Sequence, residues 1–388
     1  MLTKHRLAAG LDNRKAVIKT SLFVFSLLTA SACLAAAPLR VAIISLEHGH
    51  VAGFLNGGAL TPAGGAMHRP DIQVVGIVEK DQQLFDKYAA RFHWSADMHF
   101  RSIEEMASRT HPDAALIFTS TAGHTKAVED CAKLGIHAMM EKPMAVSYKD
   151  ALAMAEAARR GKIHVLVDYE TSWYGSNKAA RDLLEQGALG TLLKCVVRDG
   201  HSGPKAIHVS PEFFAWLTDP KLNGAGALYD FGCYGADLMT WLMKGEKPES
   251  VTAVTRQIQP DVYPKVDDEA DVLLTYKNAV GILQGSWNWP FNVKDMDVYG
   301  RTGHLLTIGS DRVNVRRAGD KEGHVEEAAH PDAPYDDPLH YLAAVIRGSV
   351  AEEDSVSSLK TNLTVSEILD AARQSAQSGR SVKLPLRP

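Results

Sequence analysis

The sequence predicts an α/β protein in which a doubly wound parallel sheet comes first and a mostly antiparallel open sheet follows. Apolar runs of strand length alternate with amphipathic helices in the first half, as a parallel sheet with crossover helices requires. Runs rich in β-branched and aromatic residues, joined by hairpin signals, dominate the second half. The 388 residues are 45% hydrophobic and 23% charged, which suits two domains with sizeable cores.

Residues 1–37 have the composition of a secretory signal peptide. Arg14, Lys15 and Lys19 precede the apolar run SLFVFSLLTA and the small residues SACLAAAP. The apolar run is shorter than the roughly 18 residues that a membrane anchor needs. We expect an exported, periplasmic protein, and the ASAC stretch leaves open a lipoprotein anchored at Cys33.

Residues 38–165 carry the parallel-sheet pattern. The expected strands are 39–45, 72–80, 114–120, 137–143 and 163–169. A short helix is expected after the first strand, and longer helices are expected at 82–92, 125–135 and 147–161. Asp81 and Ser147 stand where helix N-caps are expected.

Residues 166–388 form the second predicted domain. After a helix at 177–187, strands are expected at 192–200, 250–258, 269–277, 279–289, 295–303 and 304–317. Residues 317–338 read as a polar surface excursion. The last helix, 363–379, can pack back on the first domain before a short strand in VKLP.

Charge and cysteine spacing argue against two classes of protein. The formal net charge is −4, and no basic cluster follows the N-terminus, so a nucleic-acid partner is not expected. Cys131, Cys195 and Cys233 are widely spaced, without a C-x-x-C pair. They predict neither a metal site nor a disulfide framework, and we expect buried small apolar residues.

The stretch HAMMEKPMAV is the first with chemistry. Glu141, Lys142 and Pro143 come at the carboxyl end of an expected strand, where open α/β sheets bind ligands. A lysine there can donate hydrogen bonds to a substrate hydroxyl. The structural alternative is an ion pair between Glu141 and Lys142.

The stretch GAGALYDFGCYGADLMTWL is the second. Asp230 and Tyr234 are four residues apart and share one face if the segment is helical. A carboxylate beside a phenol can handle a proton. The structural alternative is a glycine-rich helix packed on the sheet, with Asp230 as a cap.

Taken in order, EKP, GALYDFGCYGADL and the closing EILDAARQSAQSGRSVKLP resemble the Gfo/Idh/MocA oxidoreductases, the family named for glucose-fructose oxidoreductase and inositol dehydrogenase. The resemblance runs from about Leu39 to the C-terminus. It implies a Rossmann domain that binds NAD(H) or NADP(H), then an α/β domain whose open sheet often forms an oligomer interface. It further implies a small-molecule substrate of the sugar, polyol or glycoside class, and a homo-oligomer.

The resemblance places Lys142, Asp230 and Tyr234 around a substrate carbinol. Most members have histidine where this chain has Tyr234, and tyrosine occurs in some branches. Lys142 and Tyr234 would bond the carbinol oxygen, one of them would take its proton, and hydride would pass to the nicotinamide.

The loop VAIISLEHGHVAGF lacks the glycines of a dinucleotide-binding turn. In the family register they are replaced by Ser45, Glu47 and His50. A carboxylate about 4 Å from a phosphate charge is disfavoured by roughly 1 to 4 kcal/mol. Glu47 turned to solvent, His48 or His50 as a counter-charge, or free N–H groups of the helix would compensate.

Other cofactor contacts follow from the resemblance. Glu79 stands where an acid contacts the ribose, which favours NAD over NADP. The remaining expected contacts are Thr119, Ser120, Thr121, His124 and Glu141. His48 and His50, with no third ligand evident, do not predict a metal site.

Residues able to stack on a sugar ring or bind its hydroxyls surround the expected cleft. These candidates are Tyr169, Glu170, Trp173, His201, Trp287 and Trp289. Tryptophans are at least as often part of a core.

Three functions remain open from the sequence: an exported NAD-dependent oxidoreductase acting on a sugar, polyol or glycoside; a redox-assisted glycoside hydrolase that never releases NAD; and a non-catalytic sugar-binding protein that has lost the cofactor.

Overall fold

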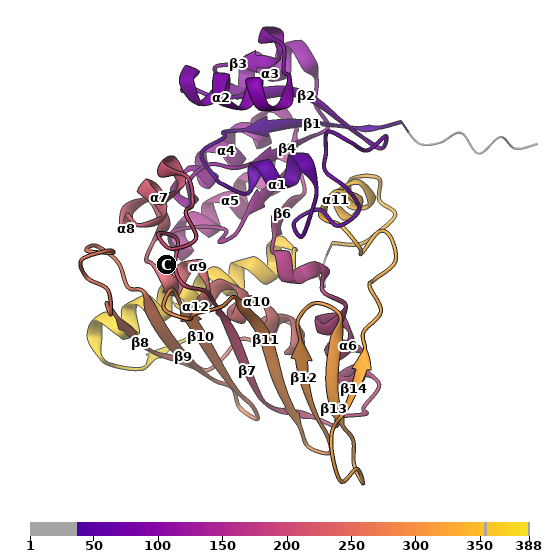
Figure 1. Ribbon diagram of the computed structural model, residues 1–388, viewed down its shortest axis with the longest axis vertical. Helices are drawn as coiled ribbons and strands as arrows, with labels where there is room; N and C mark the ends of the chain where they lie inside the picture. Colours follow the sequence, from indigo (N-terminus) through magenta and orange to yellow (C-terminus); the bar gives the residue numbers. More distant parts are fainter. Residues whose placement is uncertain (1–36, 353–354, 387–388) are drawn as a thin grey trace, which may run out of the picture. The chain divides into compact units, whose positions relative to one another are not determined.

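A six-stranded parallel sheet forms the first part of the protein (Figure 1). The structure is a computed structural model that describes residues 37–352 and 355–386, so the predicted signal peptide and Cys33 lie outside the described residues. The strand order is β3-β2-β1-β4-β5-β6, and the direction of winding reverses between β1 and β4. The strands are β1 (Leu39–Ile44), β2 (Ile72–Val78), β3 (His99–Phe100), β4 (Ala114–Ile117), β5 (His137–Glu141) and β6 (Val165–Asp168).

Helices connect these strands and cover both faces of the sheet. They are α1 (Val51–Asn56), α2 (Gln82–Phe92), α3 (Ile103–Thr110), α4 (Thr121–Leu134) and α5 (Tyr148–Gly161), with a 3-10 turn at Ala96–Met98. The predicted caps are confirmed: the Asp81 carboxylate accepts N–H groups at the start of α2, and the Ser147 hydroxyl does so at α5. Every residue of β4 and β6 is buried, which explains why these strands are continuous apolar runs.

A nine-stranded sheet forms the second part and confirms the predicted fold class. Its order is β14-β13-β12-β11-β7-β10-β9-β8-β15; β7 and β10 are parallel, and the other pairs are antiparallel. The strands are β7 (Leu192–Gly200), β8 (Ser250–Arg256), β9 (Glu269–Thr275), β10 (Val280–Ser286), β11 (Val293–Gly300), β12 (His304–Ile308), β13 (Arg312–Arg316), β14 (His324–Glu327) and β15 (Val382–Lys383).

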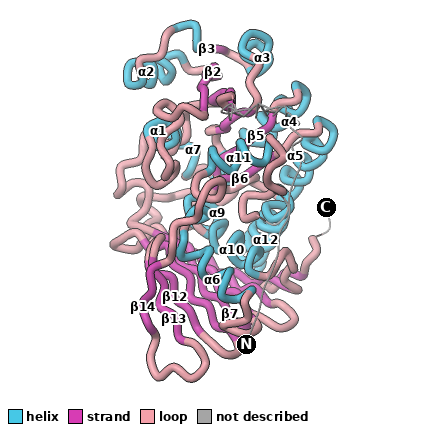
Figure 2. The backbone as a smooth tube through the Cα atoms, turned by 90° about the vertical axis from the view of Figure 1, so that its right-hand side faces the viewer, coloured by secondary structure: helices cyan, strands magenta, loops and turns pink. Residues whose placement is uncertain are grey.

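Helices pack on one face of this second sheet (Figure 2). Gly235 faces Leu283 of β10, and Gly281 of β10 faces Met239, so two glycines let a helix lie close to the strands. The remaining helices are α6 (Gly175–Glu185), α7 (Pro211–Leu217), α8 (Pro220–Asn223), α9 (Ala227–Asp230), α10 (Gly232–Leu242), α11 (Pro338–Ile346) and α12 (Leu359–Ser378), with a 3-10 turn at Glu170–Trp173. Of these, α11 packs in the core of the first sheet.

Two regions of the second sheet differ from the sequence prediction. Residues 304–317 form two strands, because Gly309 takes a positive φ of 63° and turns the chain between β12 and β13. The polar segment 317–338 contains β14, whose backbone pairs with β13 although its side chains are largely exposed. The sequence of this segment therefore lacks the alternation of apolar and polar residues that would have predicted a strand.

The last helix lies against the first sheet and its helices. The Tyr148 N–H donates to Asp370 Oδ2 at 3.1 Å, and the Val167 N–H donates to the Ser357 carbonyl at 2.9 Å. The three described cysteines, Cys131, Cys195 and Cys233, are free and buried, as predicted. Within the two described ranges, no helix has the length and apolarity to span a bilayer.

Candidate functional site

A cavity of about 500 Å³ is lined by side chains from both sheets and from the loops after their strands. Its polar wall comprises His50, Lys142, Glu170, His201, Asp230, Tyr234 and Lys294. Lys142 follows β5 directly, so the cavity lies at the carboxyl edge of the parallel sheet, where ligands bind in open α/β sheets.

Lys142 and Asp230 form a buried ion pair in this wall. Lys142 Nζ lies 2.6 Å from Asp230 Oδ1 and 3.1 Å from the Asp230 carbonyl oxygen. Burial alone would lower the pKa of Lys142, but the Asp230 carboxylate outweighs it and holds that pKa above its ordinary value. Burial likewise opposes ionisation of Asp230, yet Lys142 keeps the pKa of Asp230 below its ordinary value. The pair is therefore ionised, and the alternative ion pair between Glu141 and Lys142 is not formed.

Asp230 and Tyr234 do not share one continuous helix, which corrects the sequence prediction. The helical path breaks at Phe231, whose φ is −111°, so Asp230 ends α9 and Tyr234 lies in the first turn of α10. Both side chains nevertheless line the same cavity. The break leaves the Asp230 carbonyl free to accept from Lys142.

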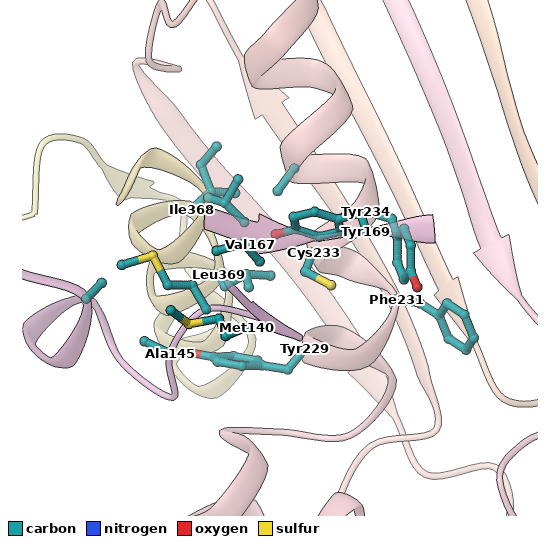
Figure 3. Close-up of a cluster of buried hydrophobic side chains, with 14 of the residues drawn as sticks. Met140, Ala145, Val167, Tyr169, Tyr229, Phe231, Cys233, Tyr234, Ile368 and Leu369 are labelled. Atoms are coloured by element: carbon teal, nitrogen blue, oxygen red, sulfur yellow. The ribbon is translucent and has the colours of Figure 1, made fainter. Parts of the chain in front are cut away.

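Tyr234 lies between the apolar core and two cations. Its ring packs edge-on against Tyr169 with centroids 5.4 Å apart, as Figure 3 shows. The ammonium groups of Lys142 and Lys294 lie 5.1 and 4.9 Å from its ring centroid. Burial raises the pKa of the Tyr234 phenol well above its ordinary value, so the hydroxyl keeps its proton.

Glu170 and Lys294 form a second ion pair in the cavity wall, and Tyr174 donates its hydroxyl to the same carboxylate. Glu170 was predicted from the sequence, whereas Lys294 was missed. A single lysine in β11 carries no sequence signal for a site, because the fold brings it to Glu170 across 124 residues.

His201 also lies in the wall, as the sequence analysis expected. Its Nδ1 accepts the Gly203 N–H at 2.8 Å, and burial lowers its pKa. The neutral ring therefore carries its proton on Nε2.

The aromatic candidates for sugar stacking do not line the cavity, which corrects that expectation. Tyr169 is fully buried and donates to Asn362 Oδ1. Trp173 is buried and donates to Asp168 Oδ1. Trp289 packs against Gly200.

Trp287 is fully buried and has a different relation to the site. Its Nε1 donates to Asp230 Oδ2 at 2.9 Å. Together with Lys142, it therefore fixes both carboxylate oxygens of Asp230.

The turn between β1 and α1 keeps the backbone of a dinucleotide-binding turn without its glycines. Ser45 adopts a positive φ of 68°, the conformation that normally favours glycine. Five N–H groups of the turn donate within the protein: Leu46 to Glu79 Oε2, Glu47 to Ser45 Oγ, His48 to the Phe118 carbonyl, His50 to His48 Nδ1 and Val51 to the His48 carbonyl. In this conformation these five donors are taken up by acceptors of the protein itself.

Glu47 does not point freely into solvent. Its Oε1 accepts the N–H of Ser120, the residue before α4, at 3.0 Å. Burial raises the pKa of the Glu47 carboxyl, the Ser120 N–H opposes the rise, and the Glu79 carboxylate adds to it. His48 is buried against the rings of Phe213 and Trp216 of α7.

The other expected cofactor contacts lie at the same sheet edge. Glu79 is buried, and its carboxylate accepts from Leu46 and Asp81, so it holds the turn in place. Thr121 donates to Asn223 of α8. The Thr119 hydroxyl donates to the Ser120 carbonyl.

His124 is buried in α4 beside the EKP loop. Its Nδ1 lies 3.2 Å from the Met144 carbonyl, and burial lowers its pKa to about 4, so the ring is neutral. Its Nε2 has no hydrogen-bond partner in the described chain.

The residues present fit the nicotinamide end of a dinucleotide more readily than its pyrophosphate. Lys142 and the cavity fit the nicotinamide end. A pyrophosphate at the turn would take the Leu46 N–H that Glu79 now accepts. The Glu47 carboxylate, which accepts the Ser120 N–H, disfavours a phosphate charge nearby by roughly 1 to 4 kcal/mol.

Comparison with known families agrees with this geometry. The family described as "Oxidoreductase family, NAD-binding Rossmann fold" matches residues 51–169, and the "GFO/IDH/MocA C-terminal domain" matches residues 177–306. The chain belongs to the Gfo/Idh/MocA family of oxidoreductases. The resemblance inferred from the sequence and its expected NAD-binding Rossmann domain are thereby confirmed.

Individual proteins are also similar to this chain, some in sequence and some in fold. The trans-1,2-dihydrobenzene-1,2-diol dehydrogenase of Macaca fuscata fuscata is 28% identical over 55% of this chain, and the match spans 59% of its own length. The 1,5-anhydro-D-fructose reductase of Ensifer adhaerens is 23% identical over 68% of this chain and 79% of its own. The structure of an Azotobacter vinelandii inositol dehydrogenase homolog complexed with NAD+ has the same fold, with a TM-score of 0.76 and 17% identity over 90% of this chain and 98% of its own.

Proposed function

We propose that the protein is an NAD-dependent oxidoreductase acting at a carbinol or carbonyl carbon of a sugar, polyol or glycoside. The observation that carries this proposal is the buried Lys142–Asp230 pair, which borders the cavity together with Tyr234. The substrate class is supported by the relatives named for a diol and for an anhydrofructose.

The side chains of the site stabilise negative charge that develops on a substrate oxygen. Lys142 is held as a cation by Asp230, and Tyr234 keeps its phenolic proton. Both side chains are buried, and both can donate hydrogen bonds to an oxygen that gains negative charge. When bound, NAD supplies or accepts the hydride at its nicotinamide ring.

The proton reaches or leaves the substrate oxygen through the same groups. During reduction, Lys142 or Tyr234 gives its proton to the oxygen, and Asp230 favours the return of Lys142 to its charged form. During oxidation one of the two must first lose a proton. The two side chains are therefore arranged as proton donors.

The residues that would hold NAD come from three loops at the edge of the parallel sheet. Ser45 shapes the turn after β1, Glu79 would contact the ribose after releasing Leu46, and His124 lies beside the EKP loop. Thr119, Ser120 and Thr121 complete this set, on the family resemblance.

A second function is favoured by one specific observation. Five N–H groups of the turn after β1 already have acceptors within the protein, and the Glu47 carboxylate lies on the Ser120 N–H beside the turn. A sugar-binding protein without a cofactor would retain the cavity and this closed turn.

Mass spectrometry of small molecules released from the undialysed, denatured protein distinguishes the two functions. Near-stoichiometric NAD supports the oxidoreductase and a cofactor that is not released. Absence of nucleotide, together with no gain in thermal stability from millimolar NAD or NADP, contradicts it and favours the sugar-binding function.

We further propose that the protein is exported to the periplasm, on the composition of residues 1–37, with a lipid anchor at Cys33 as the alternative. The mass of the mature protein tests both, because cleavage shortens the chain and lipidation adds mass. A homo-oligomer through the open sheet is supported by the exposed Val254, Leu273 and Tyr299. Sedimentation analysis tests the oligomer.

A further inference from the structure

Three side chains that can ligate a metal meet at the carboxyl edge of the parallel sheet. His48 and His50 come from the turn after β1, and Glu141 is the last residue of β5. Each offers one ligand atom, and these atoms lie within 4.8 Å of one another. His50 Nδ1 is 2.9 Å from Glu141 Oε1. Metal–ligand bonds of about 2.0–2.2 Å place neighbouring ligand atoms roughly 3.0–3.5 Å apart, so this contact is close to the required separation.

Both imidazole rings offer lone pairs inside the turn. His48 Nδ1 accepts the backbone N–H of His50 at 3.1 Å, so this nitrogen is unprotonated, and its lone pair would bind a cation when that hydrogen bond opens. A cation that takes the place of the proton between His50 Nδ1 and Glu141 Oε1 would bind both groups. His48 and Glu141 are almost fully buried, at 1% and 2% exposure, and are therefore fixed by their surroundings.

A second buried carboxyl group lies beside Glu141 at this edge. Asp168 lies opposite Glu141 in the β5–β6 pairing and is 1% exposed. Asp168 Oδ2 is buried without a hydrogen-bond partner in the described residues. The nearby lysines have other carboxylate partners: Lys142 pairs with Asp230 and Lys294 pairs with Glu170. The carboxyl oxygens of this edge therefore have fewer donors or cations than they can accept.

We propose that His48, His50 and Glu141 bind a divalent transition-metal cation of the Zn²⁺ type. Two imidazoles and one carboxylate are the donor set of catalytic zinc sites, which keep a further coordination position open. Nitrogen donors disfavour Mg²⁺ and Ca²⁺, which prefer oxygen ligands.

The open position of this ion faces the proposed substrate. His50 lines the same cavity as Lys142 and Tyr234, so the ion is exposed to that space on the His50 side. A hydroxyl or carbonyl oxygen of a sugar-like molecule is the class of ligand that would complete its coordination. The site requires no dinucleotide, so cation binding is measured without NAD. Because His48, His50 and Glu141 also stand where cofactor contacts are expected, bound NAD and the ion would compete for them.

Calorimetric titration of the tag-free, chelator-treated protein with Zn²⁺ tests the site. We expect one equivalent to bind, and Co²⁺ in its place to give the visible absorption of a low-coordinate cobalt site. His50→Ala and Glu141→Gln should each weaken binding by at least about 100-fold. His68→Ala, which removes an exposed histidine outside the cluster, should bind like the original chain.

Two results would overturn the proposal. One is the absence of stoichiometric Zn²⁺ or Co²⁺ binding to the unaltered protein. The other is binding that neither variant weakens while circular dichroism shows both to be folded. If His50→Ala does not fold, Glu141→Gln and the unaltered protein decide the outcome, because the amide keeps the size of the side chain.

Discussion

Lys142 Nζ lies 2.6 Å from Asp230 Oδ1, and both side chains are buried in the wall of the cavity. A buried cation kept charged by a neighbouring carboxylate is suited to stabilise negative charge on a substrate oxygen. The pair joins the end of β5 to the end of α9, 88 residues apart. Activity and stability therefore depend on the same contact.

Replacing Lys142 by methionine should lower the turnover of any substrate found by at least about 100-fold, because it removes a charged donor from the substrate oxygen. It also leaves Asp230 as an uncompensated buried charge, so the free energy of unfolding should fall by about 3–5 kcal/mol. Steady-state kinetics and chemical denaturation measure the two effects. Lys133→Met, which removes an exposed lysine on α4, is the matched control. Unchanged turnover in a folded Lys142→Met protein would refute the assignment.

Adding Asp230→Asn to Lys142→Met should restore much of the lost stability without restoring turnover. The second substitution removes the unpaired charge, whereas the proton donor is still missing. A double variant that regained activity would show that Lys142 acts only through packing.

Trp287→Phe should reduce kcat by about 10-fold with little change in KM, because the indole holds Asp230 Oδ2 and does not line the cavity. The pH profile of kcat should shift as well, since Asp230 loses a hydrogen bond to its charged form. An altered KM with an unchanged pH profile would indicate a direct substrate contact instead.

Glu47→Gln should tighten NAD binding, by up to about 1000-fold, because it removes a negative charge from the turn and keeps an oxygen for the Ser120 N–H. Calorimetric titration with NAD measures the effect. Glu104→Gln, an exposed acid on α3, is the control. Equal affinity in both variants would mean that Glu47 lies away from the phosphates in the complex.

Asp237→Asn should stabilise the protein at neutral pH. Both carboxylate oxygens of Asp237 are buried without a hydrogen-bond partner in the described chain, and burial raises its pKa well above the ordinary value of 3.8. The unfolded chain therefore loses this proton first as pH rises above 3.8, and the stability of the folded chain falls. The advantage of Asp237→Asn should thus grow between about pH 4 and 7. Urea denaturation at several pH values measures it, and a pH-independent difference would contradict the argument.

The elements that the sequence predicted correctly are strands buried on both faces of the sheet and helices with a clear N-cap. The apolar runs of β4 and β6 and the capped helix α2 were evident because local pattern and tertiary position agree there. Helix α3 was missed because its sequence, IEEMASRT, buries only Ile103 and Met106. A helix with so few apolar positions has little periodicity to detect.

Site residues that belong to a sequence motif were predicted, whereas those that only the fold brings to the cavity were missed. Lys142 and Asp230 belong to recognisable stretches, and both line the cavity. Trp287 was expected at the substrate because aromatic type alone cannot separate a stacking surface from a buried donor. The contact between His50 and Glu141 spans 91 residues and depends on strand order, which composition does not specify.

The contact between Val167 and Ser357 bears on how the chain acquires its structure. The outer edge of β6 is closed by a segment nearly two hundred residues further along, which also leads into α12. During synthesis this edge stays unpaired until the C-terminal end has emerged. Open strand edges of this kind recruit other chains. A fragment that ends just after β6 should therefore self-associate rather than behave as an autonomous nucleotide-binding module, and the intact protein should melt in a single cooperative transition.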